Sequence, residues 1–213
     1  MLLQGKKLNF IGDSITEGVG VEREENRYVD RIAAATGAIC RNYGISGTRI
    51  ARQKTPSDEP RFDLDFCARY EEMDADADAV IVFGGTNDCG HGDAPLGSRG
   101  DRTADTFYGA LHVLYSGLQA RYPGKPIVVL TPLPRSGERD FDPPLSLYVQ
   151  IIREVAAEFG LPVLNLYATS PLRTEDPAIV EAYVPDGLHP NDAGHRYLAE
   201  QIGEYLYNLL ENS

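Results

Sequence analysis

The chain has 213 residues, of which 42% are hydrophobic and 24% are charged, a composition ordinary for one α/β domain with a sizeable core. Its formal net charge of -12 disfavours nucleic acid or an anionic membrane surface as a main partner, because both repel an acidic protein. Only a short apolar stretch precedes Gln4, and no run approaches the roughly 20 apolar residues of a spanning helix. We therefore expect neither a secretory signal nor membrane insertion.

The cysteines of the chain are Cys40, Cys67 and Cys89. An odd number of widely spaced cysteines is typical of reduced thiols rather than of a disulfide framework, which predicts a cytoplasmic protein. Because no C-x-x-C pair occurs, a structural zinc site is not expected.

Apolar runs alternate with amphipathic stretches along the whole chain. The predicted strands cover residues 8–11, 38–43, 79–83, 126–130 and 162–166. The predicted helices cover residues 28–35, 62–73, 103–122, 147–159 and 190–210, and polar loops are expected at 45–61, 89–102, 134–146 and 170–185. Strands that are apolar on both faces and alternate with helices indicate a parallel sheet covered on both sides, within a single domain over residues 1–213.

Three unusual turns follow the first three predicted strands. They are Gly-Asp-Ser at residues 12–14, NYGISG at residues 42–47 and GGTND at residues 84–88. If the strand order is 2-1-3-4-5, then Ser14, Gly44 and Asn87 lie side by side where the sheet binds ligands. The N–H groups of Ser14 and Gly44 and the amide of Asn87 are donors that could hold an oxyanion beside the Ser14 hydroxyl.

A serine nucleophile also needs a base, and a base is usually oriented by a carboxylate. The spacing Asp-x-x-His occurs three times, at Asp88/His91, Asp186/His189 and Asp192/His195. His195 is predicted to lie inside the last helix as part of a surface pair, and His91 in a glycine-rich loop that fixes it poorly. His189 follows the fifth strand and precedes Pro190, so it can return to the active edge with Asp186 beside it. We therefore predict that His189 is the base and Asp186 its carboxylate partner because of their position after the fifth strand, since all three pairs share the same spacing.

Together, these stretches resemble the motif blocks of the SGNH hydrolases, also called the GDSL esterase/lipase family. The turn at residues 12–14, Gly44, Asn87 and the D-x-x-H of residues 186–189 match the blocks in order and span almost the whole chain. Ile15-Thr16 follows the GDS turn, where the family often has Leu-Thr. The G-x-S-x-G elbow of the α/β-hydrolases is absent from the sequence.

The resemblance implies a flavodoxin-like three-layer α/β/α sandwich with a five-stranded parallel sheet in the order 2-1-3-4-5. It implies ester hydrolysis without metal or cofactor, with Ser14, Asp186 and His189 as the catalytic residues. The oxyanion hole would be formed by Ser14, Gly44 and Asn87. It also implies a small-molecule ester substrate, which could be a sugar ester, a lipid or a thioester.

The polar loops and the absence of tryptophan favour short, acetyl-type acyl groups on sugar-like or other polar alcohols. Lysophospholipid or thioester hydrolysis on longer acyl groups is the alternative within the same chemistry. A non-catalytic flavodoxin-like binding protein, with the GDS turn around a phosphate, and a metal site at Asp13, Asp186 and His189 are alternatives of other classes. The oligomeric state is left open.

Simpler roles exist for the same residues. Ser14 could cap the following helix, Gly44 could serve only as a turn glycine, and Asn87 could form an Asx turn. Asp186 and His189 could be no more than polar residues at a helix entry. Three arginines, Arg49, Arg52 and Arg135, follow strand ends, and we expect them to be solvated surface residues rather than substrate contacts.

Overall fold

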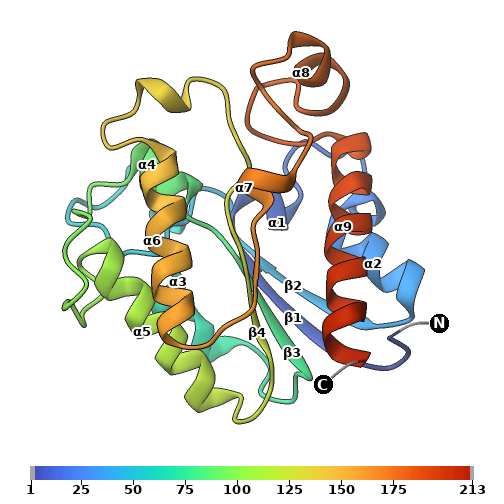
Figure 1. Cartoon of the computed structure of the whole chain (residues 1–213), viewed down its shortest axis with the longest axis horizontal. Helices are drawn as coiled ribbons and strands as arrows, with labels where there is room; N and C mark the ends of the chain where they lie inside the picture. Colours follow the sequence, from blue (N-terminus) through green and yellow to red (C-terminus); the bar gives the residue numbers. More distant parts are fainter. Residues whose placement is uncertain (1–2, 212–213) are drawn as a thin grey trace.

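A computed structural model describes residues 3–211 and has a central five-stranded sheet between two layers of helices (Figure 1). All strand pairs are parallel, and their order is β2-β1-β3-β4-β5. The strands are β1 (Lys7–Gly12), β2 (Ile39–Gly44), β3 (Ala79–Phe83), β4 (Ile127–Leu130) and β5 (Val163–Leu164). The predicted three-layer sandwich and strand order are therefore confirmed.

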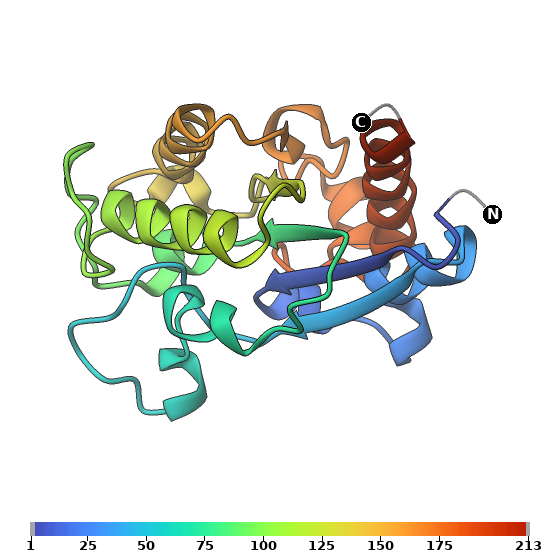
Figure 2. The same cartoon turned by 90° about the horizontal axis from the view of Figure 1, so that it is seen from below.

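The central strand β3 explains why helices cover both faces of the sheet. All residues of its AVIVF sequence are buried, with Val80 and Val82 in one apolar cluster and Ile81 and Phe83 in the other. The first cluster includes side chains of α3 (Phe66–Arg69), α5 (Phe107–Arg121) and α6 (Leu145–Glu158), and the second includes side chains of α2 (Tyr28–Thr36) and α9 (Asp192–Glu211). Figure 2 shows the same division, with α5 and α6 on the left and α9 on the right.

Shorter elements connect the layers. The helices are α1 (Ser14–Glu17), α4 (Thr86–His91), α7 (Leu166–Thr169) and α8 (Pro177–Tyr183), and the 3-10 turns are η1 (Glu24–Asn26), η2 (Pro60–Asp63), η3 (Tyr70–Glu72) and η4 (Glu138–Asp140). Four predictions need correction. Helix α4 occupies the start of a predicted loop, and α8 lies within another. The predicted helix 62–73 is divided into the short helix α3 and the 3-10 turns η2 and η3, and β5 is only two residues long.

The chain path brings the ends of β1, β2 and β3 to one level. Gly12 pairs with Gly44 on one side and with Phe83 on the other. From β1 the chain continues to β2 on one side, and from β2 it crosses to β3 on the other side of β1. The strand order therefore reverses at the carboxyl end of β1. The three turns predicted from the sequence to form the site all lie at this edge of the sheet.

Within residues 3–211, no helix is long and apolar enough to cross a membrane.

Candidate active site

The turn between β1 and α1 presents Ser14 at a helix start. A Cβ atom at Gly12 would lie 1.9 Å from the Thr16 hydroxyl oxygen, so only glycine fits there. Asp13 caps α1 by accepting a hydrogen bond from the Ile15 N–H at 3.1 Å, and Ser14 is the first helical residue. The capping role considered for Ser14 is therefore wrong, since Asp13 fills it.

The structure brings Ser14, His189 and Asp186 into one hydrogen-bonded chain. The Ser14 Oγ lies 3.0 Å from His189 Nε2, and His189 Nδ1 lies 2.6 Å from Asp186 Oδ2. Since a carboxylate only accepts, Nδ1 carries the proton and the lone pair of Nε2 faces the Ser14 hydroxyl. The Ser14 proton therefore has an acceptor within one hydrogen bond, although 175 positions separate the two residues in sequence.

Asp186 is held in its charged form. Burial alone would raise the pKa of its carboxyl, but hydrogen bonds from the His189 backbone, the His189 ring and the Leu188 backbone outweigh burial and lower it. The two backbone bonds, at 2.7 Å from His189 and 2.9 Å from Leu188, both end on Oδ1. The local turn therefore fixes one carboxylate oxygen and leaves the other for the imidazole.

The other two Asp-x-x-His pairs differ from their predicted surroundings. His195 is fully buried, not a surface residue, and its Nδ1 accepts a hydrogen bond from the Tyr28 N–H at 3.1 Å. Asp192 binds the Glu22 N–H and the Asn26 side chain instead of His195. His195 is thus a core residue between α2 and α9.

His91 also differs from its prediction. It ends α4 instead of lying in a loop, and Arg49 Nη2 lies 2.6 Å from its Nδ1. Because arginine stays protonated, Nδ1 is the acceptor and the neutral ring carries its proton on Nε2. Arg49 is itself buried, which corrects the expected solvation of this side chain, whereas Arg52 is exposed as expected.

Asn87 lies in the first turn of α4 and is buried. The chain enters this helix through Gly85, whose φ of 108° is a conformation that favours glycine. Asn87 Nδ2 donates to the Thr48 carbonyl at 3.0 Å. An amide nitrogen has two hydrogens, so this bond orients the group and leaves one donor for a ligand.

Gly44 does not suit the donor role predicted for it. Its N–H donates to Asn42 Oδ1 at 2.8 Å, so this donor is already engaged. Gly47, in the same NYGISG stretch, has a φ of 77° and an N–H with no acceptor among residues 3–211. Thr48, the residue after Gly47, is the one whose carbonyl holds Asn87. The sequence contains both glycines, and only the hydrogen-bond pattern separates them.

Arg69 joins the strand ends beneath the site and was missed by sequence reasoning. Its guanidinium donates to the carbonyl oxygens of Gly12 and Tyr43 and to the Thr48 hydroxyl. Burial lowers its pKa to about 10, although the carboxylate of Asp13 opposes the shift. No motif marks Arg69, since its role depends on carbonyl groups that come together only in the fold.

A parallel sheet of this order, with a hydroxyl, an imidazole and a carboxylate in contact at its carboxyl edge, defines the SGNH class of hydrolases. The chain belongs to the GDSL-like Lipase/Acylhydrolase family, whose model matches residues 10–197. That match extends from β1 through His189, so it includes every residue of the candidate site.

Three individual proteins to which the chain is similar share 25–33% of its sequence. The chain is 25% identical over 213 residues to an acetylxylan esterase of Xylanibacter ruminicola, covering 90% of this chain but 41% of that protein. It therefore spans less than half of that relative. It is 28% identical to a GDSL lipase of Mycobacterium tuberculosis, covering 92% of this chain and 79% of that protein. A solved structure of a Lactobacillus plantarum protein is 33% identical with a TM-score of 0.81, covering 95% of this chain and 97% of that chain.

Proposed function

We propose that the chain is a carboxylic ester hydrolase that works through an acyl-enzyme on Ser14. The observation that carries this proposal is the hydrogen-bonded chain from Ser14 Oγ through the His189 ring to the Asp186 carboxylate, at 3.0 and 2.6 Å. This arrangement can activate a hydroxyl as a nucleophile, a task that neither a phosphate cradle nor a helix cap requires.

In the proposed reaction, His189 Nε2 takes the Ser14 proton while Oγ attacks the ester carbonyl carbon. The carbonyl electron pair moves to its oxygen, where the Ser14 N–H, the second Asn87 amide hydrogen and the Gly47 N–H stabilise the charge. The tetrahedral intermediate then expels the alcohol, which leaves with the proton from Nε2. Water then attacks the acyl carbon and gives a proton to Nε2; the bond from that carbon to Oγ breaks, Oγ takes the proton back from Nε2, and the acid leaves.

We further propose that the substrates are short-chain, acetyl-type esters of sugar-like or other polar alcohols. Two observations support this choice. Two charged side chains, Arg49 and Arg135, contact α4. One relative is an acetylxylan esterase, although it is much longer than this chain. Hydrolysis of longer acyl groups, as by a lysophospholipase or thioesterase, is the competing substrate class.

The test compares the wild type with Ser14→Ala on p-nitrophenyl esters from acetate to palmitate and on acetylated xylo-oligosaccharides. We expect the wild type to favour acetate, and Ser14→Ala to lower kcat by about a thousandfold or more. Near-normal turnover by the variant would contradict the role of Ser14. A preference for palmitate would contradict only the proposed substrate class.

A further inference from the structure

Arg135 is half-buried near the site, and the protein leaves its guanidinium almost unpartnered. Nη1 lies 3.4 Å from both the carbonyl and the hydroxyl oxygens of Thr86, at the outer limit of hydrogen bonding. Nε is buried with no partner, and Nη2 has no acceptor within residues 3–211. Buried polar groups normally find a partner, so this lack needs an explanation.

The other two arginines at the same edge provide the comparison. Every nitrogen of the Arg69 guanidinium donates to a protein oxygen. Arg49 Nε is buried without a partner, as in Arg135, but both terminal nitrogens of Arg49 are bonded, Nη1 to Ser57 Oγ at 3.0 Å and Nη2 to His91. Arg49 and Arg69 are therefore explained by what they hold together, whereas Arg135 is not.

Arg135 also connects the two halves of the candidate site. The next residue, Ser136, donates its N–H to the Gly187 carbonyl at 2.8 Å, and Gly187 lies between Asp186 and His189. On the other side, Nη1 lies against α4, where a Cβ atom at Gly90 would be only 2.5 Å away. The backbone next to Arg135 thus contacts the turn that carries the base, and its guanidinium lies against the helix that carries Asn87.

The guanidinium has a fixed orientation but no carboxylate partner. Its Cζ lies 5.0 Å from the centroid of the Phe141 ring. The nearby Glu138 carboxylate accepts instead from the Arg135 backbone N–H at 2.8 Å and from the Tyr167 hydroxyl at 2.6 Å. In a chain with a net charge of -12, a cation left without an ion pair against α4, the helix that carries Asn87, suits an anion supplied by the ligand.

We propose that Arg135 is a specificity-determining residue that binds a carboxylate carried by the ester substrate. The planar guanidinium can donate two parallel hydrogen bonds to a carboxylate, which fixes the ester relative to Ser14. This inference rests on the proposed esterase function and narrows it to esters with an acidic group near the scissile bond. The carboxylate can belong to the acid or to the alcohol part of the ester.

The test uses two matched pairs of esters. On the acid side, p-nitrophenyl hemisuccinate is compared with p-nitrophenyl butyrate, and on the alcohol side, 4-acetoxybenzoate is compared with 4-acetoxybenzamide. Each kcat/KM is divided by the rate constant for hydroxide, which removes differences in intrinsic reactivity. We expect the wild type to prefer the anionic member of at least one pair, and that pair identifies the part that carries the carboxylate.

Arg135→Gln should lower the anionic-to-neutral ratio of kcat/KM by about tenfold to a hundredfold, the size expected for a charged hydrogen bond. Arg135→Lys should retain part of the preference. Gly90→Ala should lower the same ratio, because its methyl group displaces Nη1 while alanine favours the helix. The matched control is Arg139→Gln, whose side chain is 83% exposed, and it should leave the ratio unchanged.

The outcomes separate the two proposals. If Arg135→Gln slows both members of each pair equally, the residue is structural and the inference is overturned while the esterase function stands. The same conclusion follows if the wild type shows no preference for either anionic ester. If the wild type hydrolyses none of the esters, the proposed function is overturned and the inference with it.

Discussion

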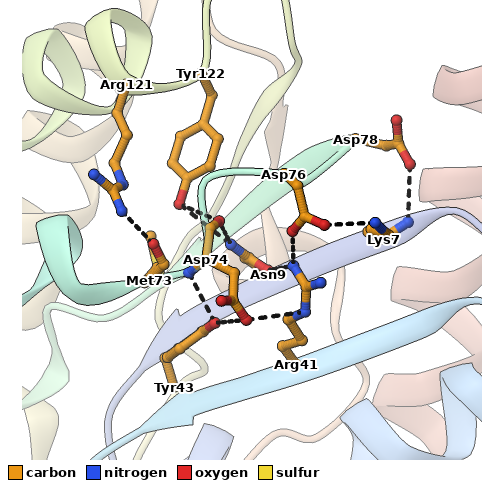
Figure 3. Close-up of polar contacts among 10 residues, drawn as sticks. All are labelled: Lys7, Asn9, Arg41, Tyr43, Met73, Asp74, Asp76, Asp78, Arg121 and Tyr122. Carbon is orange, nitrogen blue, oxygen red and sulfur yellow. Dashed lines mark hydrogen bonds and ion pairs between the residues drawn. The ribbon is translucent and has the colours of Figure 1, made fainter.

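At the amino end of the sheet, Lys7 and Arg41 are paired with acidic residues of the turn before β3 (Figure 3). Arg41 Nη1 lies 2.6 Å from Asp76, and its Nε lies 3.2 Å from Asp74. Hydrogen bonds from Arg41 and Lys7 hold the pKa of Asp76 below its usual value. At this end, opposite charges meet at the surface and stabilise each other modestly.

At the carboxyl end, the chain buries acidic groups without comparable compensation. Burial raises the pKa of Asp13 to about 7 and that of Asp88 to about 6. Their hydrogen-bond partners are backbone N–H groups, that of Ile15 for Asp13 and those of Ile50 and Ala51 for Asp88. Acidic groups with perturbed pKa values are typical of a functional site. Variants at this end should therefore change activity, and variants at the other end only stability.

The largest effect is expected for His189→Ala. Loss of the base should lower kcat by about a thousandfold or more while the free energy of unfolding changes little, because the ring lies at the surface of the site. The control is His195→Ala, which should lower stability through its lost core contacts and keep most of the activity. Steady-state kinetics and urea unfolding of both variants measure these effects. If His195→Ala lost activity and His189→Ala kept it, His195 rather than His189 would be the base.

Asn87→Ala should lower kcat by about a hundredfold, the usual cost of one oxyanion donor. The reason is that its second amide hydrogen acts on charge that develops only in the transition state. Kinetics on p-nitrophenyl acetate measure this effect. A change confined to KM would indicate substrate binding instead.

Asp13→Asn should change how stability depends on pH. Between pH 3.8 and about 7, folded Asp13 retains a proton that the unfolded chain releases, so its contribution to stability falls as the pH rises. Asparagine can still cap α1 but does not titrate. We expect the variant to match the wild type near pH 4 and to exceed it by about 4 kcal/mol near pH 8, as measured by urea unfolding. A difference that is constant with pH would contradict the raised pKa.

The smallest effect is expected for Asn9→Ala at the amino end. Asn9 is fully buried in β1, and its Nδ2 donates to the Asp74 carbonyl at 2.8 Å and lies 3.2 Å from the Tyr122 hydroxyl (Figure 3). The variant should lose about 1–2 kcal/mol of unfolding free energy through these unmade bonds. Its kcat should stay at the wild-type value, and a marked loss of activity would show that the two ends are coupled.

The sequence was most informative where local pattern and tertiary environment agree. The bounds of β3 were predicted correctly because its apolar residues suit a strand buried on both faces. Helix α2 was located through Gly37, whose φ of 76° ends it. The motifs that led to Ser14, Asp186 and His189 contain the whole hydrogen-bonded chain, although their catalytic roles stay a prediction.

Elements that depend on distant contacts could not be found in this way. Helix α4 has the sequence TNDCGH, which is poor in helix formers, and it is held by Asp88 bonds to residues about 38 positions away. The choice between Gly44 and Gly47 depends on a side-chain acceptor, Asn42. Arg135 was expected to be a solvated surface residue, because nothing local indicates that its guanidinium lies against α4.

Labelling with a fluorophosphonate, followed by peptide mass spectrometry, tests most directly whether Ser14 is an activated nucleophile. We expect stoichiometric modification of Ser14 in the wild type, strongly slowed in His189→Ala and unaffected by chelators. An unmodified Ser14, or a label on another residue that persists in Ser14→Ala, would contradict acyl chemistry at this site.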